Sequence, residues 1–161
     1  MIRSTGTTRR GASTKILIFA LSIVCLAGCS KVAEPSGKIE TIEQGRSAWA
    51  ARGSLQYTFT VELQCFCTAE MRGPFLVNVE NGAATVTREG SIVEPGWLSN
   101  VPTSADALFA FAESRRDQKD FRAAFDQTYG LPVDVWSDPI PEAADEELGI
   151  IVSGISVSTQ P

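Results

Sequence analysis

Apolar and polar residues alternate along residues 55–67. Every odd position there is apolar, and the even positions are polar except for Phe66. Because successive side chains of a strand point to opposite faces, this period predicts one long strand with an apolar face and a polar face. Two cysteines, Cys65 and Cys67, end the apolar face and are the first candidates for special chemistry.

Two other stretches predict helices. Residues 39–52 predict a first helix, and Gly53 is expected to cap its end. The side chains that align roughly on one side of this helix are Ile39, Ile42, Arg46 and Trp49. A second helix is expected from Thr103, which would cap it, to about residue 115. Between the strands and this helix, residues 89–102 combine two prolines and two glycines with Trp97, so we expect an irregular loop there.

The remaining strands are predicted from turn signals. Asn81-Gly82 is the strongest two-residue hairpin signal, and a turn there pairs Val77 with Val86 within residues 74–88. A second hairpin is expected from residues 121–126 and 131–137, with Pro132 at the beginning of a strand, where a missing N–H costs little. Residues 148–157 are expected to form a final strand.

The order helix, strand, hairpin, helix, hairpin, strand predicts an α+β fold. We expect a mainly antiparallel sheet of about five or six strands, with two helices packed on one face. With 161 residues, of which 43% are hydrophobic, the chain is long enough for one domain with a core, which we assign to residues 39–158.

The first 28 residues have the composition of a secretory signal. A basic segment precedes an apolar run, Ile16 to Leu26, which is too short to span a bilayer, since about 20 residues are needed. The run ends in Leu26-Ala27-Gly28-Cys29, which resembles the signals of bacterial lipoproteins. That resemblance implies cleavage after Gly28 and lipid on Cys29. The alternative is an uncleaved anchor with a chance cysteine.

This resemblance also predicts a location. Residues 29–38 would be the lipidated cysteine and a flexible tether, with a typical span of about 15–18 Å. The domain would then lie in the bacterial cell envelope, outside the cytoplasm, with the membrane as its partner through Cys29. If the host has two membranes, Ser30 resembles the sorting pattern for the outer membrane.

Charge and composition exclude several classes of function. Of the 14 Lys and Arg residues, four precede Cys29, whereas all 19 Asp and Glu residues follow it. A domain this acidic repels phosphate backbones, so we expect no nucleic-acid partner. The chain has no histidine, which excludes mechanisms and zinc sites that use imidazole.

Several spaced residues resemble a known family. They are Trp49, Tyr57-x-Phe59, Cys65-x-Cys67 and Asp126-x-x-x-Gly130-x-Pro132. The pattern resembles a domain-of-unknown-function family of small secreted bacterial lipoproteins over nearly all of residues 39–157. The resemblance implies a location and a fold, with no established activity and no catalytic residues, and it implies that the last motif shapes a turn.

The cysteine pair allows several interpretations. Residues i and i+2 of a strand lie about 6.6 Å apart, the upper limit for a disulfide, so a bridge between Cys65 and Cys67 requires the strand to bend. The alternatives are two buried reduced thiols, a catalytic redox pair and a Cu(I) site. No Lys or Arg lies within four residues, and Leu63 is a neighbour on the apolar face, so we expect a structural role and low reactivity.

The sequence thus predicts a membrane-anchored extracytoplasmic lipoprotein of unknown molecular activity. Its domain is expected to be a non-enzymatic binding or envelope-accessory module, which contacts an envelope protein or a small ligand through the Trp97 loop or the open face of the sheet. No catalytic residue, metal ligand or cofactor is predicted. The alternative is a thiol redox or metal-binding envelope protein that uses Cys65 and Cys67.

Overall fold

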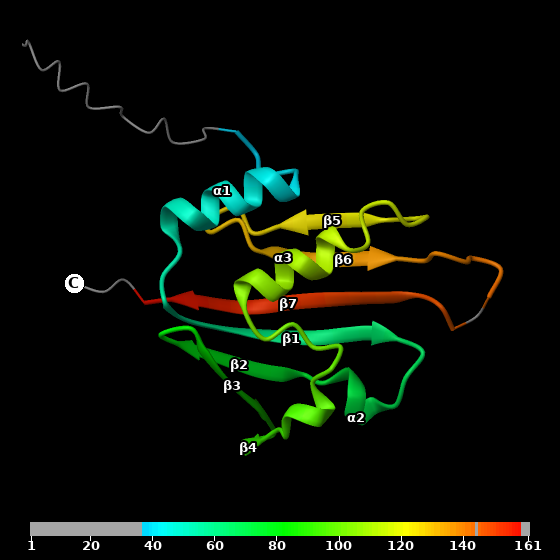
Figure 1. Ribbon diagram of the computed structural model, residues 1–161, viewed down its shortest axis with the longest axis horizontal. Coiled ribbons are helices and arrows are strands. Elements are labelled where there is room, and N and C mark those ends of the chain that lie inside the picture. Colours follow the sequence, from blue (N-terminus) through cyan, green and yellow to red (C-terminus); the bar gives the residue numbers. More distant parts are fainter. Residues whose placement is uncertain (1–36, 144, 159–161) are drawn as a thin grey trace, which may run out of the picture. The chain divides into compact units, whose positions relative to one another are not determined.

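An antiparallel sheet of seven strands forms the centre of the fold in the computed structural model, which describes residues 37–143 and 145–158 (Figure 1). The strand order is β4-β3-β2-β1-β7-β6-β5, and all neighbouring strands pair antiparallel. The strands are β1 (Gln56–Cys65), β2 (Phe75–Glu80), β3 (Ala83–Arg88), β4 (Ser91–Ile92), β5 (Arg122–Phe125), β6 (Pro132–Ser137) and β7 (Leu148–Val157).

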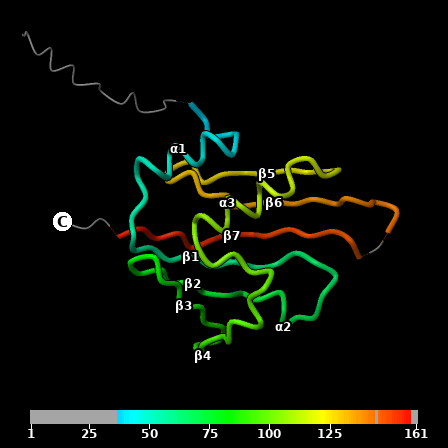
Figure 2. The backbone as a smooth tube through the Cα atoms, in the orientation of Figure 1, coloured from blue at the N-terminus to red at the C-terminus, as the bar shows by residue number. Residues whose placement is uncertain are grey.

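The two longest strands, β1 and β7, lie side by side at the middle of the sheet, although almost the whole domain separates them in sequence (Figure 2). Their register places Val61 opposite Val152 and Leu63 opposite Ile150. All four side chains are buried. The last strand of the chain therefore pairs directly with the first.

The alternation along β1 is confirmed by burial. Tyr57, Phe59, Val61 and Leu63 are buried, whereas Glu62 between the last two is exposed. The apolar face of β1 thus forms the core of the domain, and its polar face is open to solvent.

Two longer helices cover that core. α1 (Ile42–Arg52) and α3 (Ala105–Glu113) contact each other, and both contact Tyr57 of β1. The Trp49 ring of α1 packs edge-on against the Tyr57 ring at 4.9 Å, and the backbone N–H of Ala105 donates to the Tyr57 hydroxyl at 2.9 Å. One tyrosine on the buried face therefore contacts both helices.

The helices begin later than the sequence pattern predicts. α1 starts at Ile42 because Thr41 is its N-cap: the Thr41 hydroxyl accepts from the Gln44 N–H, and the Gln44 side chain accepts from the Thr41 N–H. The predicted cap of α3, Thr103, is wrong by one residue, since the Ser104 hydroxyl accepts from the Ala107 N–H at 3.1 Å.

The hairpin predictions are confirmed in register. Val77 lies opposite Val86 in the β2–β3 pair, and the two turn residues Asn81 and Gly82 have φ of 51° and 82°. Pro132 begins β6 as expected. The final strand, β7, has the predicted bounds.

Three sheet and helix predictions are corrected. The sheet has seven strands in place of five or six, because β4 forms within the stretch predicted to be irregular. The first strand ends at Cys65 and does not reach Cys67. The structure also contains a short helix, α2 (Ala69–Arg72), and a 3-10 helix, η1 (Pro95–Trp97), that the pattern did not predict.

Candidate functional site

The sequence singles out four residues, and the structure describes three of them. Cys65 and Cys67 lie at the end of β1 and just after it, and Trp97 is the last residue of η1. Cys29 lies outside the described residues. The cysteines and Trp97 belong to different surface hollows, so the structure does not bring them into one site.

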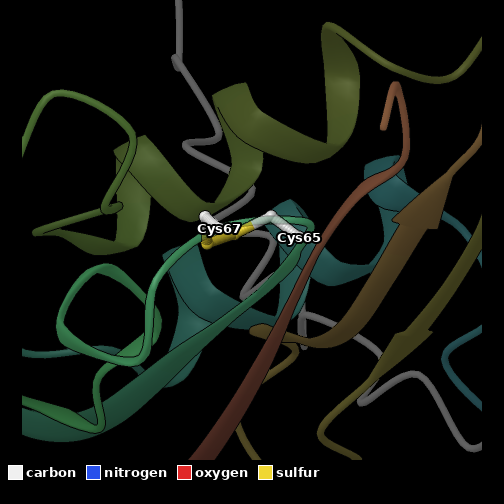
Figure 3. The surroundings of a disulfide bond; sticks show 2 residues. All are labelled: Cys65 and Cys67. Atoms are coloured by element: carbon white, nitrogen blue, oxygen red, sulfur yellow. A yellow bond between two sulfur atoms is a disulfide. The ribbon is translucent and has the colours of Figure 1, made fainter. Parts of the chain in front are cut away.

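Cys65 and Cys67 form a disulfide (Figure 3). The chain leaves the extended conformation after Cys65, and the two Cα atoms lie 5.3 Å apart, well inside the range that a disulfide allows. The bend that the sequence argument required is therefore present. Both residues are only half-buried, although they continue the apolar face of β1 in the sequence pattern.

The residues around the disulfide form an open hollow of about 420 Å³. Its lining consists of Cys65, Phe66, Cys67, Thr68 and Arg72. Phe66, the residue that breaks the alternation of the strand, is 78% exposed. No Lys or Arg lies within four residues of the cysteines in sequence, but the turn into α2 brings Arg72, five positions after Cys67, to the same hollow.

A larger hollow surrounds Trp97. It has a volume of about 690 Å³, within the range of small-ligand pockets. Trp97 is 68% exposed and Ile92 of β4 is 73% exposed, so two large apolar side chains face solvent here. The lining comes from α2, the start of β2, the end of β3, β4 and η1: Glu70, Phe75, Arg88, Glu89, Ser91, Ile92, Val93, Glu94 and Trp97.

The charges of the Trp97 hollow are mainly negative. Three glutamates and one arginine line it. The Arg88 guanidinium donates to the backbone carbonyl of Glu70 at 2.9 Å and lies 3.9 Å from the Glu89 carboxylate. Hydrogen bonds from its own backbone N–H and from the Thr68 hydroxyl hold the pKa of Glu70 below its ordinary value, so this carboxylate is ionised at neutral pH.

Sequence reasoning found Trp97 and missed its neighbours. Ile92 and Val93 are an apolar pair in a stretch otherwise rich in Gly and Pro, and that pair was the available signal for β4. Glu70 and Arg88 had no such signal, because 18 residues separate them and only the contact of α2 with the end of β3 brings them together.

The open face of the sheet has its own polar cluster. The Arg122 guanidinium lies 5.1 Å from the Trp136 ring centre and 3.9 Å from the Asp134 carboxylate. Buried oxygens of Gln64 and Asp134 have no hydrogen-bond partner within the part of the chain that the structure describes.

A third hollow of about 560 Å³ lies where α1 joins β1, and the end of β7 completes its lining. In residues 37–143 and 145–158, no three acidic or cysteine side chains are grouped to hold a metal ion. Over the same residues, no helix has the length and hydrophobicity needed to cross a membrane.

One comparison with known proteins gives a match. The model of a family of unknown function, DUF6174, matches residues 41–157. No curated protein and no solved structure matches the chain. The expected resemblance to a domain of unknown function is thereby confirmed, and the match says nothing of a lipid anchor.

Proposed function

The chain belongs to the family of unknown function DUF6174, and from its own residues we propose that it is a membrane-anchored extracytoplasmic lipoprotein. Its domain, residues 39–158, acts in this proposal as a non-enzymatic binding module of the bacterial cell envelope. The anchor is lipid on Cys29. The binding surface is the hollow around Trp97.

The anchor is supported by one observation above all: the apolar run that ends in Leu26-Ala27-Gly28-Cys29. These residues lie outside those that the structure describes, and their sequence alone supports the anchor. A basic segment, an apolar run of this length and a small residue before a cysteine are the features of a lipoprotein signal. With Ser30 next to the lipidated residue, the outer membrane is the proposed destination in a host with two membranes.

The disulfide agrees with a location outside the cytoplasm. Cys65 and Cys67 are joined in the structure, and disulfides persist mainly in oxidising compartments such as the periplasm and the cell surface.

The binding surface is supported by exposure and charge. A ligand in the Trp97 hollow would cover two exposed apolar side chains, Trp97 and Ile92, and exposed apolar clusters of this kind mark interaction sites. The excess of glutamates over arginine favours a positively charged group on that ligand. A cation over the indole ring would gain a further cation–π interaction. The proposed ligand therefore combines an aromatic or apolar group with a positive charge.

Cys29→Ser is expected to abolish the membrane anchor, because serine lacks the thiol that receives the lipid. The variant should accumulate as the unprocessed precursor. Each buried methylene of an acyl chain contributes about 0.8 kcal/mol to membrane binding, and stable attachment needs two or more chains. Without lipid on residue 29, no partial attachment through lipid is expected. Immunoblotting of detergent-phase and aqueous-phase fractions measures both processing and partition.

Cys25→Ser is the matched control, since Cys25 lies four residues earlier and would be removed with the signal. It should leave processing and partition unchanged. Normal processing of Cys29→Ser, with the protein still in the detergent phase, would contradict the anchor.

Trp97→Ala is expected to abolish binding of a cationic aromatic probe without unfolding the domain, because Trp97 is 68% exposed. Phenethylammonium is the probe, and its neutral counterpart 2-phenylethanol should bind more weakly because it lacks the charge that the glutamates favour. Amide chemical shifts of the full chain measure binding. Shift changes should gather at Ile92, Val93 and Trp97; changes elsewhere, or equal shifts with both probes, would contradict the proposed surface.

A further inference from the structure

The Cys65–Cys67 disulfide connects no two elements of the fold. Its cysteines are two positions apart in one segment that leaves the end of β1. Because the stabilisation from loop closure grows with loop length, a loop this short contributes little to the free energy of unfolding. The sheet is therefore expected to stay folded after reduction, so the folded protein can hold either redox state.

The disulfide is also accessible. Both cysteines are partly exposed and line the same open hollow. Phe66, which stands between them, is 78% exposed, and Met71 on α2 is 42% exposed. An exposed aromatic side chain between two accessible cysteines offers a contact for a partner.

Arg72 supplies a positive charge to the hollow that the disulfide lines. It lines the disulfide hollow with both cysteines and a second hollow, of about 470 Å³, with Cys65. Its side chain forms no ion pair with a carboxylate in the described part of the chain. A neighbouring guanidinium favours the thiolate over the thiol, and a thiol of lower pKa is the better leaving group in exchange.

From these three observations we propose that Cys65 and Cys67 form a thiol–disulfide exchange site, whose substrate is a protein or peptide with two thiols. The inference goes beyond the proposed binding function and does not depend on the Trp97 surface. It takes up the redox alternative that the sequence left open, in place of the structural role expected first for the pair.

The exchange proceeds in two displacements. A thiolate of the partner attacks the sulfur of Cys67, the Cys65–Cys67 bond breaks, and its electron pair leaves on the sulfur of Cys65 beside Arg72. The partner's second thiolate then attacks the partner's own sulfur in the mixed disulfide and releases Cys67 as thiolate. The partner loses two electrons and gains a disulfide. Cys65 and Cys67 gain those electrons and the two protons of the partner's thiols.

The first test is reduction of the native full chain by glutathione. Trypsin releases residues 53–72 as one peptide that contains Cys65 and Cys67 and no other cysteine, so alkylation and mass spectrometry follow the pair alone. Native reduction should proceed at a rate comparable with that of the urea-unfolded chain, and circular dichroism should not change. Reduction only as fast as the domain unfolds, or unfolding upon reduction, would overturn the proposal.

The second test concerns Arg72. Arg72→Gln should slow reduction by glutathione about three- to tenfold, because the leaving thiol has a higher pKa, and Arg72→Lys should restore most of the rate. In the Gln variant the tryptic peptide extends to Arg88. Arg52→Gln is the control, since Arg52 precedes the other end of β1 and donates to the Thr128 carbonyl. Equal rates for Arg72→Gln and Arg52→Gln would contradict the role of Arg72.

The third test replaces glutathione by a synthetic peptide with two thiols. The peptide should gain one disulfide for each protein disulfide lost. Phe66→Ser should slow this reaction and leave the glutathione rate unchanged, because only the larger partner contacts Phe66. Absence of transfer to the peptide, or the same loss of rate with both reductants, would contradict the proposed docking of a dithiol partner.

Discussion

Phe59→Ala is expected to lower the free energy of unfolding by about 3 to 5 kcal/mol. Phe59 is fully buried at the centre of β1, and its ring stacks at 6.2 Å from the ring of Tyr57. Truncation removes buried apolar area and leaves a cavity, since a sheet covered by two helices cannot collapse into the space. A domain of this size has only about 5–15 kcal/mol of net stability, so a large share would be lost.

Thr58→Ala is the matched control for this prediction. Thr58 is the neighbour of Phe59 on the open face of the same strand, and it pairs with Asn78. Its truncation should cost about 1 kcal/mol or less, within the range of strand propensities. Urea denaturation measures both variants. Similar losses for the two would contradict the assignment of one buried and one open face.

Gly130→Ala is expected to lower the free energy of unfolding by about 3 kcal/mol, from backbone strain and overlap together. Gly130 has a φ of 84°, which L side chains rarely adopt. A Cβ there would lie 2.5 Å from the Gly45 carbonyl oxygen and 2.8 Å from the Ala48 Cβ. These atoms belong to α1 and cannot move away as the end of a flexible side chain could.

Gly82→Ala separates the two contributions. Gly82 has a φ of 82°, close to that of Gly130, but a Cβ there would meet nothing within 4 Å. Gly82→Ala should therefore lower the free energy of unfolding through backbone strain alone, by about 1 to 2 kcal/mol. Thermal or urea unfolding of both variants gives the difference. If Gly130→Ala costs no more than Gly82→Ala, α1 does not pack against the β5–β6 turn as the structure has it.

The Gly130 contact explains a motif that the sequence analysis could only interpret as a turn. The Asp126 carboxylate accepts from the backbone N–H groups of Thr128 and Tyr129, and the Gly130 N–H donates to the Asp126 carbonyl at 2.9 Å. These bonds shape the turn. Glycine is required at position 130 because the backbone of α1 lies close to it. No pattern within the hairpin could predict that contact.

Most strands were predictable because their signals are local. Alternation along β1, the Asn81-Gly82 turn and the apolar run of β7 depend on residues close in sequence, and the structure has all three. The end of the first strand was predicted two residues too late, because Cys67 continues the period although the chain already turns. β4 was missed because its two residues are too few to show a period.

The packing of α1 was not predictable from apolar spacing. The helix buries Ile42, Gly45 and Ala48, and two of these are too small to mark a hydrophobic stripe. The expected stripe included Arg46, which is exposed and lies 4.9 Å from the Phe109 ring. Close approach of the helix backbone, and not side-chain hydrophobicity, decides which side faces the domain.

The candidate sites were predictable only in their most conspicuous members. Cysteines and tryptophans are rare, so Cys65, Cys67 and Trp97 stand out in any sequence. Nothing in the local sequence distinguishes Arg72 and Arg88 from other surface arginines. Only the position of α2 shows that they line the two hollows. The short helix α2 follows a bend that the hydrophobic pattern does not predict. Residues of α2 line both the disulfide hollow and the Trp97 hollow.

The intact mass of the mature protein, extracted from the membrane fraction, tests the central proposal most directly. A lipid anchor at Cys29 predicts a chain that begins at Cys29 and is heavier than residues 29–161 by the mass of the lipid on its sulfur and amine, with the added mass confined to the N-terminal peptide. A mature protein without added lipid, or one that retains residues 1–28, would contradict the proposal.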